Sequence, residues 1–264
     1  MSTQPHMTEP ILSVLDLSVH FGGLVAVSKL SFHVREGQVT SIIGPNGAGK
    51  TTAFNAITGF LPPTEGTVHY RGRCLNGLKP NEIADLGVVR TFQKTSLFGG
   101  ISVFENVMIG LHLQGERRAW EILLGLSRVR KEEEILRERA QDVLEFVGLA
   151  GRASELGDAL PYGEQRLLEV AIALAARPSL LLLDEPVSGM NPSETESFMK
   201  MIDKIREREI TILLVEHDMK IVMGVSDHVV VLNQGEIISE GPPETIRHDP
   251  EVIHAYLGHG GQRA

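Results

Sequence analysis

The feature that most constrains the fold is a glycine-rich segment at residues 44–52, which follows the short apolar run of residues 39–43. Its spacing fits G-x-x-x-x-G-K-[ST], in which glycines let the backbone curl and point successive N–H groups at phosphate oxygens. The lysine places a positive charge between the β- and γ-phosphates of a nucleotide, and the next hydroxyl can ligate Mg²⁺. The members of the segment are Gly44, Pro45, Asn46, Gly47, Ala48, Gly49, Lys50, Thr51 and Thr52. A strand precedes the segment and a helix is expected from about Lys50, so we predict a phosphate-binding loop for ATP with Mg²⁺ rather than a chance match.

A second candidate site element is an acidic strand end further along the chain. Four consecutive leucines at residues 180–183 lead into Asp184 and Glu185, and such a run is typical of a fully buried parallel strand. Ligands bind at the carboxyl ends of strands in open α/β sheets, so both carboxylates are expected near the phosphate loop. Asp184 is then placed to hold Mg²⁺, and Glu185 to polarise an attacking water as general base. A capping pair at a strand exit is the alternative.

Strand and helix patterns alternate along most of the chain. The expected strands are at residues 11–43, 67–70, 180–184, 210–216, 228–232 and 236–239, and the expected later helices at 162–176, 193–208 and 218–224. This alternation predicts an α/β fold with a mostly parallel core sheet that is covered on both faces.

Residues 100–156 have a different character and are expected to form a helical insert. Apolar residues recur there at helical spacing, which predicts one long amphipathic helix. These residues are Ile135, Leu136, Ala140, Val143, Leu144 and Val147. We expect the charge run at residues 128–134 to be a solvated helix face.

Composition excludes several classes of protein. The chain has 25 Lys and Arg against 34 Asp and Glu, a net charge of −9, which opposes binding to a nucleic-acid backbone. Cys74 is the only cysteine, so neither an internal disulfide nor a cysteine zinc site can form, and a reducing cytosol fits. No apolar stretch reaches the roughly 20 residues of a membrane span, and residues 1–10 do not read as a signal peptide. We therefore expect a soluble protein that can still dock onto a membrane protein.

Three more features, in their order and spacing, resemble motifs of the ATPase subunits of ABC transporters. Gln93 ends residues 90–93, Arg-Thr-Phe-Gln, where that family has its Q-loop. Residues 160–166, Leu-Pro-Tyr-Gly-Glu-Gln-Arg, open a helix before the acidic strand and resemble the signature motif. His217 follows the apolar strand at 210–215 and resembles the switch histidine. The resemblance covers about residues 11–257.

This resemblance implies a P-loop ABC-type ATPase fold: a mostly parallel core sheet, an antiparallel β-subdomain and a helical subdomain. It implies one ABC ATPase domain over residues 1–264. Within it, residues 11–99 and 157–240 would form the nucleotide-binding core with the β-subdomain. Residues 100–156 would form the helical subdomain, and 241–264 the C-terminal helix and tail.

The resemblance also implies roles for individual residues. Two subunits would face each other head to tail, each ATP lying between one phosphate loop and the partner's signature, which includes Gly163 and Glu164. Gln93 would sense Mg²⁺ and the γ-phosphate; an ordinary polar loop residue is the alternative. His217 would contact the γ-phosphate and orient the water; the alternatives are a metal cluster or a plain exposed histidine. Phe21 would stack on adenine, unless it is a core residue of its strand.

A narrower resemblance is to the larger ATPase subunit of bacterial branched-chain amino acid importers, the Liv or HAAT family. The segments that carry it are residues 21–27, 87–93, 216–225, 233–235 and 255–258. It implies a second ATPase subunit in a homo- or heterodimer, transmembrane permease subunits and, indirectly, a periplasmic solute-binding protein. The chain would then be cytoplasmic, peripheral on the inner face of the cell membrane. An ABC ATPase of a lipopolysaccharide-export or other non-import complex remains the alternative, and urea, short amides and aromatic acids remain alternative solutes.

The signature and the loop after the acidic strand depart from the family pattern. Pro161 stands where a small hydroxyl residue is usual, Tyr162 where glycine is usual, and Asn191 where aspartate is usual. A proline is sterically welcome in a first helical turn, so the signature helix should still form. Because Pro161 cannot donate a hydroxyl to a γ-phosphate, we expect the composite site that uses this signature to be the weaker one.

We also expect the surface of residues 93–106 to dock a cytoplasmic helix of a membrane subunit. The stretch should be exposed, yet it carries the apolar residues Phe98, Ile101, Val103 and Phe104. Packing within the helical insert is the alternative reading.

Overall fold

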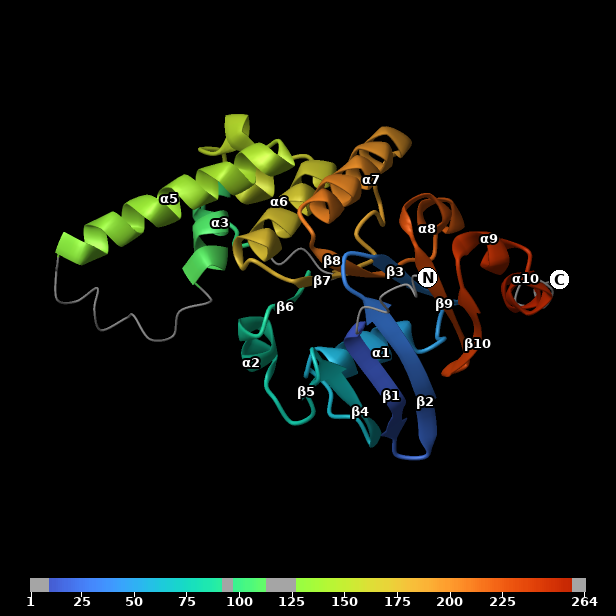
Figure 1. Ribbon diagram of the computed structural model, residues 1–264. Helices are drawn as coiled ribbons and strands as arrows, with labels where there is room; N and C mark the ends of the chain where they lie inside the picture. Colours follow the sequence, from blue (N-terminus) through green and yellow to red (C-terminus); the bar gives the residue numbers. More distant parts are fainter. Residues whose placement is uncertain (1–9, 92–96, 113–126, 258–264) are drawn as a thin grey trace, which may run out of the picture.

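The structure is a computed structural model of residues 1–264 and describes residues 10–91, 97–112 and 127–257 (Figure 1). Its central element is a six-stranded sheet in the order β10-β9-β3-β8-β7-β6. The bounds are β3 Val39–Ile43, β6 Val88–Arg90, β7 Leu180–Asp184, β8 Thr211–Val215, β9 His228–Asn233 and β10 Glu236–Gly241. Neighbouring strands from β9 to β6 pair in parallel, and only the edge strand β10 is antiparallel. The predicted mostly parallel core sheet is confirmed.

A second, antiparallel sheet has the order β2-β1-β4-β5. Its strands are β1 Pro10–Phe21, β2 Leu24–Arg35, β4 Glu65–Tyr70 and β5 Arg73–Cys74. Helix α1, Lys50–Ile57, packs between this sheet and the core sheet, since the buried side chains of all three share one hydrophobic cluster. The short helix α2, Pro80–Asp85, lies beside β6 and contributes Ile83 to the same cluster.

The opposite face of the core sheet is covered by helices, which Figure 1 shows above the sheet. They are α3 Val103–His112, α5 Ser127–Val147, α6 Tyr162–Ala175, α7 Pro192–Glu207 and α8 Met219–Val225. The leucines of β7 show the two-sided burial: Leu180 and Leu182 join the cluster on the α1 side, whereas Leu181 and Leu183 join the cluster of α6 and α7. The first four positions of this strand are all apolar because both faces are covered.

Two further helices, α9 Pro243–Arg247 and α10 Pro250–Leu257, pack beside β9 and β10. Helix α5 is the predicted long amphipathic helix, and its residues Ala140, Leu144 and Val147 are buried. Ile135, one of the apolar residues of this pattern, lies in the helix but is 45% exposed. Figure 1 shows the first half of α5 extending beyond α3 and α6.

Candidate active site

The predicted phosphate loop connects β3 to α1. Gly49 immediately precedes α1 with φ +100°, and a Cβ at this position would lie 2.7 Å from the carbonyl oxygen of Ala26, so a side chain does not fit. Gly47 has φ +82° and open space around it, so it is needed for its backbone conformation alone. No side chain caps α1 at Gly49, which leaves the first N–H groups of the helix for phosphate oxygens.

The loop is braced by a turn that is distant in sequence. The N–H of Gly235, between β9 and β10, donates to the carbonyl of Ala48 at 3.1 Å, and its carbonyl accepts from the N–H of Ser28 in β2 at 2.8 Å. Both sheets thereby fix one side of the phosphate loop. Sequence reasoning used the Asn-Gln-Gly stretch at 233–235 only as a mark of resemblance, and its bracing role depends on contacts that local patterns do not reveal.

Lys50 lies inside the loop and is 6% exposed. Its Nζ donates to the carbonyls of Gly44 at 2.7 Å and Pro45 at 3.1 Å. Burial lowers the pKa of Lys50, and the negative charges of Glu185, Asp184 and Glu216 oppose that shift. The ammonium group therefore stands between the phosphate loop and a group of carboxylates.

The predicted carboxylates lie at the end of β7, where parallel pairing sets Asp184 opposite Val215 of β8. Asp184 is 1% exposed. Glu185 leaves the strand in a left-handed conformation, φ +46°, and its N–H donates to the carbonyl of Val215 at 2.9 Å. This turn brings the Glu185 carboxylate to the edge of the sheet, where the side chain is 22% exposed.

His217 follows β8 and lies beside the predicted general base. Its Nδ1 is 3.8 Å from Glu185 Oε1 and 3.7 Å from Glu216 Oε2, and its side chain is 53% exposed. His217 therefore lies beside the carboxylates at the sheet edge and is also open to solvent. The described residues include no group of three or more His, Cys, Asp or Glu side chains that could hold a metal ion, so the metal-cluster reading of His217 gains no support.

Glu216 is a site residue to which sequence reasoning assigned no role. It is fully buried and accepts hydrogen bonds from the N–H groups of His217 at 3.0 Å and Val187 at 3.4 Å. Burial raises the pKa of Glu216, against the opposing effect of these hydrogen bonds. The carboxyl group thus connects the backbone of His217 to the loop that follows Glu185.

Arg90, the last residue of β6, is a second residue without a predicted role. Its Nη2 lies 2.6 Å from Asp184 Oδ2, while Asp184 Oδ1 is buried and has no hydrogen-bond partner among the described residues. A buried, unpaired carboxylate oxygen at the end of β7 and a hydroxyl group in the first turn of α1, that of Thr51, are the hard-oxygen donors that suit a divalent cation. The residues present therefore fit a metal ion bound together with nucleotide phosphates.

For the remaining predicted site residues, the structure gives mainly their burial. Gln93 lies outside the described residues. Thr51 is exposed and Thr52 half-buried in the first turn of α1. Phe21 ends β1 and is 50% exposed, so the core reading of this residue is wrong and its ring is available for stacking. Among the other loop residues Pro45 is half-buried, Asn46 is exposed and Ala48 is buried.

The signature residues begin helix α6. Pro161 occupies the N-cap position with φ −53°, not the first turn as expected, and the helix starts at Tyr162. Proline has no side-chain acceptor, so the N–H groups of the first turn are left without a side-chain cap. Gly163 packs closely against α7: a Cβ there would lie 2.8 Å from the carboxyl carbon of Glu194, the flexible end of a side chain that would have to move. Glu164 is ion-paired with Arg152 at 3.2 Å.

The other departures from the family pattern have structural roles. The Tyr162 hydroxyl donates to the carbonyl of Ser188 at 2.8 Å and accepts from Arg166 at 2.8 and 3.1 Å, which ties α6 to the loop after Glu185. Asn191 is the N-cap of α7, where its side chain accepts from the N–H groups of Ser193 and Glu194, both at 3.0 Å. Asparagine and aspartate are equivalent as N-caps, so the change from aspartate keeps the helix start intact.

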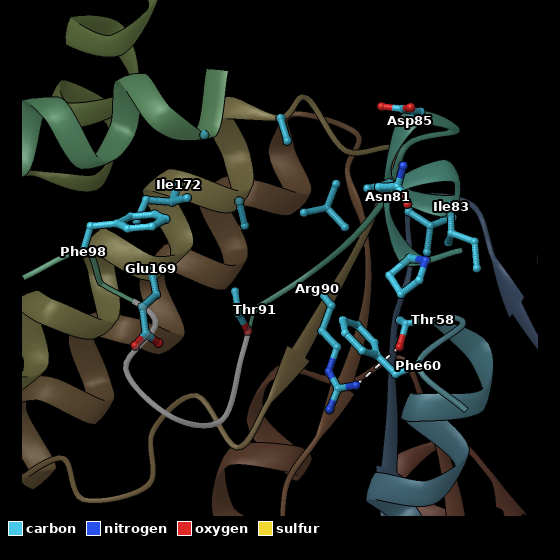
Figure 2. A pocket seen from close by; sticks show the side chains of 17 residues that line it. Thr58, Phe60, Asn81, Ile83, Asp85, Arg90, Thr91, Phe98, Glu169 and Ile172 are labelled. Atoms are coloured by element: carbon cyan, nitrogen blue, oxygen red, sulfur yellow. Dashed lines mark hydrogen bonds between the residues drawn. The ribbon is translucent and has the colours of Figure 1, made fainter. Parts of the chain in front are cut away.

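A cavity of about 340 Å³ opens beside the site (Figure 2). Figure 2 shows Phe98 and Ile172 on one wall and Phe60, Ile83 and Arg90 on the other. Of the residues expected to dock a partner, Phe98 is 48% exposed and lines this cavity. The expectation of exposure was wrong for Val103, which is fully buried in the cluster of α3, α5 and α6.

Phosphate binding at one strand end and carboxylates at the ends of neighbouring strands place this chain in the class of P-loop ATPases. A model of the family described as ABC transporter matches residues 27–188, and a model described as branched-chain amino acid ATP-binding cassette transporter matches residues 236–261. The chain belongs to the ABC transporter family, in the group of the LivG proteins, and is an ATP-hydrolysing, ATP-binding subunit.

Individual relatives support this assignment over nearly the whole chain. The high-affinity branched-chain amino acid transport ATP-binding protein LivG of Salmonella typhimurium is 46% identical over 253 residues, 96% of this chain and 99% of that protein. The ADP conformation of MJ1267, an ATP-binding cassette of an ABC transporter, is 34% identical with a TM-score of 0.84, over 95% of this chain and 100% of that one. The dimeric structure of MJ0796, a bacterial ABC transporter cassette, is 25% identical with a TM-score of 0.74, over 88% and 98%.

Within the part of the chain that the structure describes, no helix combines the length and the apolar character that crossing a membrane requires.

Proposed function

We propose that the transporter powered by this chain imports branched-chain amino acids. The observation that carries this proposal is the match of residues 236–261 to the branched-chain amino acid cassette model. That segment contains neither the phosphate loop nor the acidic strand end, so ATP binding and hydrolysis alone do not account for the match. LivG, a branched-chain amino acid transport ATP-binding protein that is 46% identical to this chain, supports the same solute class.

The test is solute-stimulated ATP hydrolysis by the assembled transporter. The chain would be co-purified with the permease, partner ATPase and solute-binding proteins encoded beside it, and reconstituted in vesicles. Leucine, isoleucine or valine should stimulate hydrolysis, while urea, short amides and aromatic acids should not. Stimulation by lipopolysaccharide in place of amino acids would favour the alternative, an ATPase of an export complex.

The site supports hydrolysis with Mg²⁺ as a second cofactor. Asp184 Oδ1 and the Thr51 hydroxyl would hold the ion, which when bound neutralises charge on the phosphate oxygens. Lys50 would bind the β- and γ-phosphates from inside the loop. Glu185 would accept a proton from the attacking water, and His217, 3.8 Å away, would orient that water. Gln93 would sense the ion and the γ-phosphate.

Glu185→Gln tests the general base. The variant should bind ATP but hydrolyse it about 10²- to 10⁴-fold more slowly, because the amide cannot accept the proton. ATP-bound dimers should then accumulate on gel filtration. Glu209→Gln is a matched control, since Glu209 also has a left-handed backbone, φ +60°, but is exposed beyond the end of α7. Wild-type turnover in the Glu185 variant would refute the assignment.

We also infer that the working unit is a head-to-tail ATPase dimer, either with a second copy or with a different ATPase subunit. The uncapped first turn of α6, at Gly163 and Glu164, would face the γ-phosphate held by the partner. The dimeric structure of the MJ0796 cassette supports a dimer for this chain. We keep the division expected from sequence, with the core and β-subdomain at 11–99 and 157–240, the helical subdomain at 100–156 and the C-terminal helix and tail at 241–264.

The cavity is proposed as the docking site for a cytoplasmic helix of a permease subunit. Its walls are mainly apolar and are drawn from both the core and the helical layer, so a partner seated there contacts both. Such docking would hold the chain on the inner face of the cell membrane, with no nucleic acid involved. A cysteine introduced at Ser102 in a Cys74→Ser background should crosslink to a permease loop. Crosslinks confined to this chain would contradict docking.

A further inference from the structure

Arg90 lies between the cavity and the carboxylate expected to hold Mg²⁺. Its Nη2 is 2.6 Å from Asp184 Oδ2, and the two side chains are only 8% and 0% exposed. A buried arginine–carboxylate pair of this kind is screened little by solvent. Arg90 therefore holds Asp184 Oδ2 in place and puts a positive charge directly beside this carboxylate.

The other amino group of Arg90 is held by α1 and a residue just after it. Nη1 donates to Asn55 Oδ1 at 2.7 Å and to Thr58 Oγ1 at 3.3 Å, the second bond being the dashed line in Figure 2. The guanidinium carbon lies 5.5 Å from the ring centre of Phe54 and 5.9 Å from that of Phe60. Because α1 begins at the phosphate loop, the same helix fixes both Lys50 and Arg90.

The charge balance of the site depends on this arginine. Asp184, Glu185 and Glu216 all act on the single ammonium group of Lys50. Asp184 Oδ1 is buried without a hydrogen-bond partner among the described residues, so it is the oxygen available to a cation. Without Arg90, a divalent cation would meet an uncompensated carboxylate even when no nucleotide is bound.

We propose that Arg90 is a positioning residue that compensates the charge of Asp184, so that Asp184 binds Mg²⁺ only together with nucleotide phosphates. The inference rests on the proposed role of Asp184 as a metal ligand. Arginine suits this task because its rigid fork bonds Asp184 with one amino group and Asn55 with the other. The phosphates of ATP then supply the further negative charge and oxygen ligands that the ion needs.

The experiment measures Mn²⁺ binding to the nucleotide-free chain from the electron paramagnetic resonance signal of free Mn²⁺. Arg90→Gln should bind Mn²⁺ roughly tenfold or more tightly than the wild type, since it removes a charge next to the ligand. Arg90→Lys, which keeps the charge, should stay within roughly threefold of the wild type. Arg71→Gln is the matched control, because Arg71 is also 2.6 Å from a carboxylate, that of Glu36, but both are exposed.

The double variant Arg90→Gln/Asp184→Asn should lose the gained binding, which would show that the ion binds through Asp184. Equal Mn²⁺ affinity in folded Arg90→Gln and wild type overturns the proposal. If Arg90→Gln fails to fold without metal, its rescue by Mn²⁺ alone supports the proposal, and failure of Mn²⁺ to rescue it overturns the proposal. None of these measurements requires transport or hydrolysis, so a failure of the proposed import function would be recognised separately.

Discussion

The hydroxyl group of Tyr162 connects the signature helix to the loop that follows the proposed general base, and its removal has a predictable cost. Tyr162→Phe keeps the ring and deletes one donated bond, to Ser188, and two accepted bonds, from Arg166. Arg166 is 6% exposed and retains its ion pair with Glu169 at 2.9 Å. The variant therefore loses hydrogen bonds without stranding a buried charge.

The magnitude follows from the types of bond lost. A neutral hydrogen bond contributes about 1 kcal/mol and a bond to a charged group about 1.5–3 kcal/mol. Tyr162 is 41% exposed, so water replaces part of what is lost. We expect the free energy of unfolding to fall by about 2 kcal/mol, which lowers Tm by about 4–8 °C in a chain of this size. The kcat of ATP hydrolysis should fall with an unchanged KM, since the loosened loop starts at Glu185.

Thermal unfolding followed by circular dichroism measures the first effect, and steady-state hydrolysis the second. Tyr70→Phe is the control, because the Tyr70 hydroxyl is buried and has no partner among the described residues. Its removal should be neutral or slightly stabilising. If Tyr162→Phe has the same Tm as the wild type, or if Tyr70→Phe loses as much stability as Tyr162→Phe, the hydrogen bonds of Tyr162 between α6 and the loop contribute nothing to stability.

Three further predictions concern the same region. Burial raises the pKa of Glu216, so the folded chain binds a proton on this carboxyl group more tightly than the unfolded chain does. The folded chain therefore loses stability as pH rises through the folded pKa. The Tm of Glu216→Gln minus that of the wild type should increase from pH 4.5 to 7, and a difference that stays constant with pH would contradict the pKa shift. Pro161→Ser supplies both an N-cap acceptor and the missing hydroxyl, so ATPase activity of the assembled transporter should rise; unchanged or lower activity would mean that the hydroxyl is not limiting. Asn191→Ala should lower the free energy of unfolding by about 1 kcal/mol and Asn191→Asp should not, as urea titration would show.

Local patterns were sufficient to predict most of the fold and the edge of the sheet that carries the site. The four leucines of β7 predict a strand buried on both faces, and the structure buries alternate leucines against different clusters. The glycine spacing at 44–49 predicts a loop that only glycine backbones allow, as the close approach of Ala26 to Gly49 shows. These predictions succeeded because a few consecutive residues are enough to specify a strand that is buried on both faces or a loop that needs glycine.

Residues that act across long sequence separations could not be predicted. Arg90 pairs with a carboxylate 94 positions away, and Gly235 braces a loop almost 190 residues earlier in the chain. Tyr162 and Asn191 could be noted only as departures from a family pattern, because their roles appear when α6, the loop and α7 are brought together. Val103 looked exposed by its neighbourhood but is covered by helices that local patterns do not position.

The backbone of Glu185 links the fold to the chemistry. Side chains alternate along β7, so a regular continuation would direct residue 185 to the same face as Leu181 and Leu183, into the cluster under α6 and α7. The left-handed turn, φ +46°, breaks this alternation and brings the carboxylate beside His217. A non-glycine residue in this conformation costs of order 1–3 kcal/mol and persists only where its surroundings over-determine it. Here the N–H of Glu185 is bonded to Val215 and its carbonyl to Ser188, whose own carbonyl is held by Tyr162. The backbone strain at Glu185, the proposed general base, is therefore sustained by helix α6, which is why a change at Tyr162 should affect turnover as well as stability.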